Sequence, residues 1–321
     1  MKRNADNYRG AGEAGFPHHA TFRTNRSGYV FVMFAAVLWA CSGSAAKFLF
    51  NSGVTPFQLI QLRTTMAAAA LLLWIAVRRP SLLRVSRKDL AFFVFLGMSL
   101  ASAQFTYLYA ISRIQVAAAI LLQYQAPLFV ALYMVAFTRT KITARTLAAM
   151  AGALSGCYLV VGAYSMDLLH LNSAGILSGV ASAVAFAWYA VQSDIGMRTY
   201  SPWTVLCYAL VFAACAWNIL IPPLQAFTFS YTTVQWWWIL FIGIVGTILP
   251  FGFYNKGIRL IRPTHASITA TLEPITAAFI AYILLGETME LWQVVGAGLV
   301  ISSIVFLQTG RKSVQKNSIA S

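Results

Sequence analysis

Two ionisable side chains inside long apolar runs are the residues best placed to carry chemistry. Arg63 lies seven positions into a run that starts at residue 56, and Glu273 lies nine positions into one that starts at residue 264. At about 1.5 Å per helical residue both are roughly 10–14 Å deep, near the middle of a bilayer core about 30 Å thick. A charge there costs about 2.5–3.5 kcal/mol on insertion scales. Three hypotheses stay open: two groups that pair or jointly face a polar cavity, a purely architectural ion pair, or a protonated Glu273 that caps a neighbouring helix.

Polar and aromatic side chains accompany these charges. Amide and hydroxyl groups that faced hydrocarbon without partners would cost several kcal/mol, so we expect them to point inward. A cavity with Trp walls and Gln and Tyr hydrogen-bonding groups suits a small amphipathic solute, although ordinary interhelical hydrogen bonds use the same residue types. The predicted substrate-binding set is Trp39, Arg63, Gln104, Tyr107, Gln123, Trp188 and Glu273.

Two prolines predict interruptions in the helices beside these residues. Pro127 and Pro274 are 147 positions apart, and each removes a backbone hydrogen bond from its helix. Freed carbonyls inside a membrane are tolerated only against protein or a water-lined cavity. Paired interruptions in corresponding segments indicate the central site and hinge of a transporter. Static kinks that only shape packing are the alternative, and Pro250 predicts a further kink.

Other chemistries lack their motifs. The sequence contains no H-E-x-x-H and no G-x-x-x-x-G-K-[ST]. The four cysteines lie in apolar runs without the Cys/His spacing of a zinc site. We therefore expect no catalytic residue, no metal site and no cofactor. The net charge of +15 is attributed to Lys and Arg residues that collect in the cytoplasmic loops of membrane proteins, and not to nucleic-acid binding.

The elements that must position these residues are membrane spans. Of the 321 residues, 59% are hydrophobic and 10% charged, against roughly 45–50% and about 25% in soluble domains. This composition excludes a soluble, disordered or coiled-coil protein and predicts an all-α polytopic membrane protein. Ten apolar runs of span length are expected: 29–49, 56–77, 90–112, 115–137, 146–165, 174–193, 203–223, 235–254, 264–285 and 291–308.

The distribution of positive charge predicts the topology. With both termini in the cytoplasm, 20 of the 23 Lys and Arg residues fall in cytoplasmic tails and loops, and only Arg113 falls in an outer loop. This asymmetry follows the positive-inside rule. A missed or additional span would move every later loop to the other side of the membrane and remove this asymmetry. We therefore predict ten spans with both ends inside.

The two halves of the chain show a weak internal repeat. At an offset of 147 residues the identical pairs are Tyr107/Tyr254, Ile111/Ile258, Ile114/Ile261, Ala119/Ala266 and Pro127/Pro274. Five spans per half is an odd number, so the second half must enter the membrane from the opposite face. The prediction is an inverted repeat.

Specific residues add a family resemblance. They are Trp39, Ser42, Lys47, Pro56, Arg63, Tyr107-Leu108-Tyr109-Ala110 and Pro127 in the first half, and Leu272-Glu273-Pro274, Leu285-Gly286-Glu287 and Gly296 in the second. With these the chain resembles EamA-type members of the drug/metabolite transporter superfamily over about residues 29–308. Such proteins often carry a Glu after the fourth span, where this chain has Arg139-Thr140-Lys141.

The resemblance implies an organisation and a function. Tails at 1–28 and 309–321 flank one EamA repeat at 29–165 (spans 1–5) and another at 174–308 (spans 6–10). The implied function is a secondary carrier, a multi-pass protein of the bacterial cytoplasmic membrane, that exports amino acids or related amphipathic compounds by alternating access. Its partners are a small-molecule substrate and the lipid bilayer. Proton coupling through Glu273 remains a hypothesis. The motifs Gly152-xxx-Gly156 and Gly175-xxx-Gly179 allow close helix packing; packing within the chain is the favoured use, and a homodimer face is the alternative.

Alternatives from the same and other classes stay open. The same fold would serve an importer or a drug- or sugar-type carrier. A channel-like protein and an intramembrane enzyme are the alternatives from different classes. An enzyme is disfavoured because the chain has one deeply placed carboxylate instead of a pair.

Overall fold

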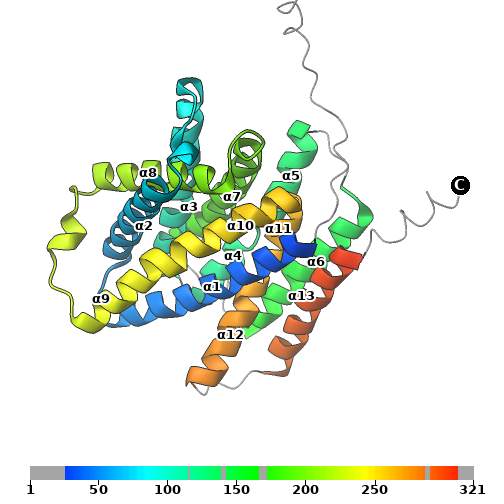
Figure 1. The fold of residues 1–321 in the computed structure, drawn as a ribbon. Helices are drawn as coiled ribbons and strands as arrows, with labels where there is room; N and C mark the ends of the chain where they lie inside the picture. The colour runs from blue at the N-terminus through cyan, green and yellow to red at the C-terminus, as the bar shows by residue number, and fades with distance from the viewer. Residues whose placement is uncertain (1–25, 115, 139–141, 166–171, 286–289, 310–321) are drawn as a thin grey trace, which may run out of the picture.

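The structure is a computed structural model that describes residues 26–114, 116–138, 142–165, 172–285 and 290–309. Within these ranges every regular element is a helix (Figure 1). The uninterrupted long helices are α1 (Arg26–Asn51), α2 (Pro56–Arg78), α3 (Leu90–Arg113), α6 (Ala144–Val160), α7 (Ser173–Gly196), α8 (Pro202–Leu220) and α13 (Leu291–Thr309). The expected tails lie almost wholly outside the described residues, and Glu287 lies outside them too.

Three further helical stretches are interrupted. The first consists of α4 (Val116–Gln123) and α5 (Ala126–Thr138). In the second, α9 (Thr233–Leu240) continues through the π-helical segment η6 (Phe241–Ile248) into α10 (Leu249–Leu260). The third consists of α11 (Pro263–Ala270) and α12 (Leu272–Leu285). Short 3-10 turns occupy the connections at Pro80–Leu83, Arg87–Asp89, Ala163–Ser165 and Gln225–Thr228.

The lengths and composition of these helices are those of a polytopic membrane protein. Eight helical stretches among the described residues are long and apolar enough to cross a membrane. The stretches α4–α5 and α9–η6–α10 each count as one of the eight. Helix α6 is apolar but shorter, at 17 residues.

Local sequence signals set where several helices begin. Thr55 and Gln58 form a reciprocal capping box at the start of α2, where Pro56 occupies the first turn. Thr232 and Gln235 do the same for α9. These caps satisfy amide groups that would otherwise lack partners at the helix ends.

The helices pack in pairs that join the two halves of the chain. The main pairs are α3 with α7, α6 with α13, α1 with α10, α3 with α8 and α2 with α8. Figure 1 shows α1 alongside α10 and α6 alongside α13. Glycines allow the closest approach: a Cβ on Gly156 of α6 would lie 2.7 Å from the carbonyl oxygen of Gly296 on α13. The reverse distance, from Gly296 to the oxygen of Gly156, is the same. The glycine-rich faces considered for a dimer, including Gly175 and Gly179, thus pack within the chain.

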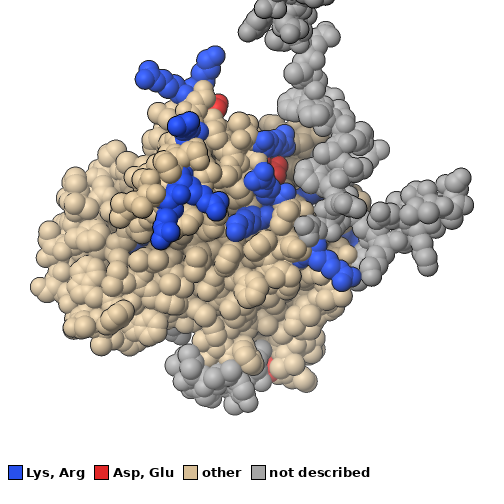
Figure 2. Space-filling model, in the orientation of Figure 1, with Lys and Arg blue, Asp and Glu red and all other residues tan. Residues whose placement is uncertain are grey.

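The outer surface is apolar around the bundle and basic at one end. Large hydrophobic side chains that point outward include Leu73, Phe95, Phe137, Leu177 and Ile219. An exposed apolar surface of this extent is typical of a protein that contacts lipid. On the face drawn in Figure 2, the Lys and Arg side chains gather towards one end of the molecule.

Candidate functional site

The two helix interruptions meet through a hydrogen bond. Helix α4 ends before Tyr124, and α11 ends before Thr271, 147 positions later. Glu273 lies in the first turn of α12, where the helix dipole favours a carboxylate. The hydroxyl group of Tyr124 donates a hydrogen bond of 2.5 Å to Oε2 of Glu273. The bond therefore joins the interruption in the first half of the chain to the interruption in the second.

Arg63 lies near Glu273 without pairing with it. Among the described residues no nitrogen of Arg63 lies within 4.0 Å of an oxygen of Glu273. Nε of Arg63 instead donates a hydrogen bond of 3.3 Å to Oγ1 of Thr247, in the π-helical segment. Tyr107 on α3 lies within electrostatic range of both charged side chains. The four groups Arg63, Tyr107, Tyr124 and Glu273 thus converge from α2, α3, the α4–α5 interruption and α12.

The predicted aromatic residues occupy two different places. Trp39 on α1 packs against Phe251 and Tyr254 of α10, with ring centroids 5.1 and 5.3 Å away, and against Phe186 of α7. Trp188 packs edge-on against Tyr133 at 5.5 Å, with 38% of its surface exposed. Trp39 is therefore within the inter-half packing, whereas Trp188 is open on one side.

The two predicted glutamines also differ. Gln104 is buried, and its Oε1 accepts a hydrogen bond of 3.1 Å from Thr64, the neighbour of Arg63. Its buried Nε2 has no partner among the described residues. Gln123 is the last residue of α4, half-buried beside the interruption.

Tyr124 and Thr247, which hydrogen-bond to the two charged side chains, lie outside the predicted substrate-binding set. Tyr124 stands at the position equivalent to Thr271 in the repeat, so the offset of 147 residues together with Pro127 was a signal that could have identified it. Thr247 precedes Pro250, but no motif in the sequence predicts that it lies on a π-helical segment beside Arg63. π-helical turns occur frequently at functional sites.

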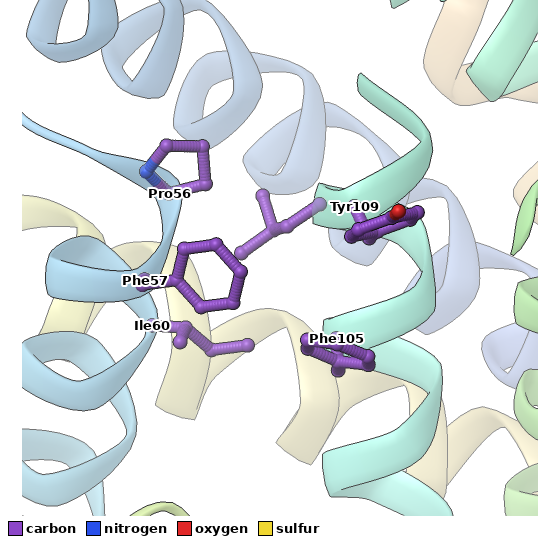
Figure 3. A pocket seen from close by; sticks show the side chains of 6 residues that line it. Pro56, Phe57, Ile60, Phe105 and Tyr109 are labelled. Atoms are coloured by element: carbon purple, nitrogen blue, oxygen red, sulfur yellow. The ribbon is translucent and has the colours of Figure 1, made fainter. Parts of the chain in front are cut away.

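Among the described residues, no group of three or more His, Cys, Asp or Glu side chains could hold a metal ion. An apolar pocket lies between the start of α2 and the end of α3, lined by Pro56, Phe57, Ile60, Phe105, Leu108 and Tyr109 (Figure 3). It includes none of the predicted substrate-binding residues.

Comparison with known proteins identifies the family to which this chain is similar. The model of the EamA-like transporter family matches the chain twice, over residues 26–162 and 173–309. The chain is 26% identical over 291 residues to the uncharacterized inner membrane transporter YicL of Salmonella typhimurium, covering 88% of this chain and 96% of that protein. It is 30% identical over 288 residues to an uncharacterized transporter of Archaeoglobus fulgidus, covering 88% and 97%.

A further relative and a solved structure extend the comparison. The threonine/homoserine exporter RhtA of Escherichia coli K12 is 23% identical over 267 residues, which cover 81% of this chain and 84% of RhtA. A solved crystal structure superposes with a TM-score of 0.73 at 20% identity, over 88% of this chain and 97% of the other. The superposition shows a shared fold.

Proposed function

Because the chain belongs to the EamA-like transporter family and is a multi-pass cell membrane protein, we propose that it exports a small organic metabolite by alternating access. The substrate class proposed is amino acids or related amphipathic compounds. The relative named as a threonine/homoserine exporter supports this class and direction. An importer or a drug- or sugar-type carrier of the same fold is the alternative that transport assays would reveal.

The proposed architecture has ten spans in two inverted repeats, at 29–165 and 174–308, with both termini in the cytoplasm. The packing of the helices supports the repeat because replacing each helix of a pair by its counterpart in the other half gives another observed pair. Helix α1 packs against α10 as α7 packs against α3, and α1 packs against α12 as α7 packs against α5. The pairs α2–α8 and α6–α13 join equivalent spans. The basic end seen in Figure 2 supports a common cytoplasmic side.

The observation that carries the proposal is the hydrogen bond between Tyr124 and Glu273. It joins the helix interruptions of the two halves at the place where transporters of inverted-repeat design bind their substrates. Arg63, Tyr107 and Gln123 border the same place and form the core of the proposed site. Pro127 and Pro274 are the proposed hinge positions, and Trp39, Gln104 and Trp188 complete the candidate set.

Transport by the purified protein in liposomes tests the proposal. A carrier gives saturable, stereoselective counterflow of its substrate, whereas a channel-like protein does not saturate in this way and an enzyme releases a product. Absence of counterflow with every amino acid and related compound tried would contradict the proposed substrate class.

Proton coupling through Glu273 is a separate part of the proposal. Glu273→Gln keeps the size of the side chain and removes its titration, so we expect export to lose its pH dependence. Glu290→Gln, at an exposed position before α13, is the matched control. Full transport with an unchanged pH dependence in Glu273→Gln would end the coupling hypothesis.

A further inference from the structure

Both charged side chains of the proposed site retain unused hydrogen-bonding capacity. A guanidinium group has five N–H donors, and the single hydrogen bond of Arg63 to a described residue uses only Nε. Glu273 accepts from Tyr124 through Oε2, and its Oε1 has no partner among the described residues. Both side chains are half-buried, so part of each surface is accessible.

The two charges are held apart by neutral hydroxyl groups. Thr247 holds Arg63 and Tyr124 holds Glu273, with more than 4.0 Å between the opposite charges. A buried ion pair that served stability alone would need close geometry, because only close contact offsets the desolvation of the two charges. The arrangement therefore leaves a positive and a negative group, each tethered on one side and each open to a partner.

We propose that Arg63 and Glu273 bind the two ends of a zwitterion, so that the site selects a free α-amino acid. This inference rests on the proposed function and names its substrate class by charge. The guanidinium takes the substrate carboxylate through its terminal N–H groups, a geometry that Arg suits well. The Glu273 carboxylate takes the substrate ammonium group.

A zwitterion fits this site better than either single ion. It adds no net charge to a site deep in the membrane, and it gives each protein charge a counterion. A substrate without the carboxylate leaves Arg63 unpaired, and a substrate without the ammonium group leaves Glu273 unpaired. Sites built to pair a polar group discriminate strongly against analogues that lack it, because the group in the protein then stays buried and unsatisfied.

Ligand binding to the purified full-length protein tests the inference. The probes are the standard L-α-amino acids, their C-terminal amides and their N-acetyl derivatives, measured by thermal stabilisation in detergent. We expect at least one free amino acid to bind about tenfold or more tightly than both of its derivatives, as loss of a charge-assisted hydrogen bond predicts. Equal binding of a free amino acid and its derivatives would overturn the inference.

Two variants assign each end of the substrate. Arg63→Gln should lose the preference for the acid over the amide and keep the preference over the N-acetyl derivative, and Glu273→Gln should do the reverse. Arg259→Gln and Glu290→Gln remove exposed charges and should keep both preferences. Arg63→Lys keeps the positive charge and should keep part of the preference for the acid over the amide. This variant tests the role of Arg63 if Arg63→Gln does not fold. Loss of both preferences together in each folded variant would contradict the assignment.

Counterflow in liposomes separates this inference from the proposed function. Saturable exchange of some other solute, with no free amino acid bound, would refute the zwitterion site and leave the carrier standing. No saturable exchange of any solute would refute the carrier itself.

Discussion

Removal of the Tyr124 hydroxyl tests the contact between the two halves quantitatively. Tyr124→Phe keeps a ring that is 8% exposed and deletes the group that lies 2.5 Å from Oε2 of Glu273. A hydrogen bond to a charged group contributes about 1.5–3 kcal/mol, which corresponds to a factor of about 10 to 150 at tenfold per 1.4 kcal/mol. Only conformers in which the two interruptions touch lose this stabilisation. The population in which they are apart should therefore rise by that factor.

Cys157 is a natural reporter of this change. It is buried on α6, and its Sγ lies 3.9 Å from the carbonyl oxygen of Thr271, at the second interruption. With Cys41, Cys207 and Cys215 replaced by Ala, a thiol reagent can label Cys157 alone. The labelling rate follows the population of the open conformer when opening and closing are fast relative to labelling.

We expect Tyr124→Phe to raise the labelling rate of Cys157 by about tenfold or more. Tyr133→Phe is the matched control because its ring packs against Trp188 and Phe137 and its hydroxyl group has no hydrogen-bond partner among the described residues. Its rate should equal that of the parent. Equal labelling rates in Tyr124→Phe and the parent would refute the idea that this hydrogen bond holds the interruptions together.

Three further predictions concern packing, a loop anchor and topology. Gly156→Ala should lower the free energy of unfolding by about 1–3 kcal/mol, because the new Cβ would lie 2.7 Å from the carbonyl oxygen of Gly296. Denaturation in detergent measures this change. The control is Gly298→Ala, whose Cβ would meet no atom within 4 Å and should leave the denaturation unchanged. The hydroxyl group of Tyr200, between α7 and α8, donates to Asp89 at 2.5 Å, and this bond raises the pKa of Tyr200. The stabilisation from this hydrogen bond is therefore complete below the unfolded pKa of about 10 and is lost as pH rises through the folded pKa. At pH 8 the bond is intact, so Tyr200→Phe should speed tryptic cleavage of the connection 79–89. An unchanged cleavage rate would contradict the role of Tyr200 as an anchor of this connection. A reporter fused after residue 321 should read out as cytoplasmic, and a periplasmic reading would contradict the proposed topology.

The sequence predicted the helices where composition and backbone requirements coincide. The run 29–49 became α1 (Arg26–Asn51). Helices α4 and α11 end at Gln123 and Ala270, each four residues before a proline, because Pro127 and Pro274 have no N–H group to donate to those carbonyls. The predicted run 146–165 extends past α6, which ends at Val160; Gly162 has a φ of +68°, a turn conformation that glycine adopts readily.

Where prediction fell short, contacts between distant residues decide the structure. Helix α10 continues to Leu260, beyond the predicted end at 254, and Lys256 in this extension lies beside two aromatic rings. Its ammonium lies 5.3 Å from the ring centre of Phe31 and 5.2 Å from that of Trp203. The partner of Glu273 is 149 residues away in sequence. Only the folded chain identifies such a pair, so the sequence left open whether Glu273 pairs with Arg63, and the structure gives Tyr124 as its hydrogen-bond partner.

Access to the interruption from both sides of the membrane tests the central claim most directly. A single cysteine at Gln123, in a chain whose four native cysteines are replaced by Ala, places a thiol at the half-buried end of α4. In membrane vesicles of either orientation, alternating access predicts that a membrane-impermeant thiol reagent labels this position from each side, and that bound substrate slows the labelling. Labelling from one side only, under every condition and whether or not substrate is present, would contradict alternating access at this site.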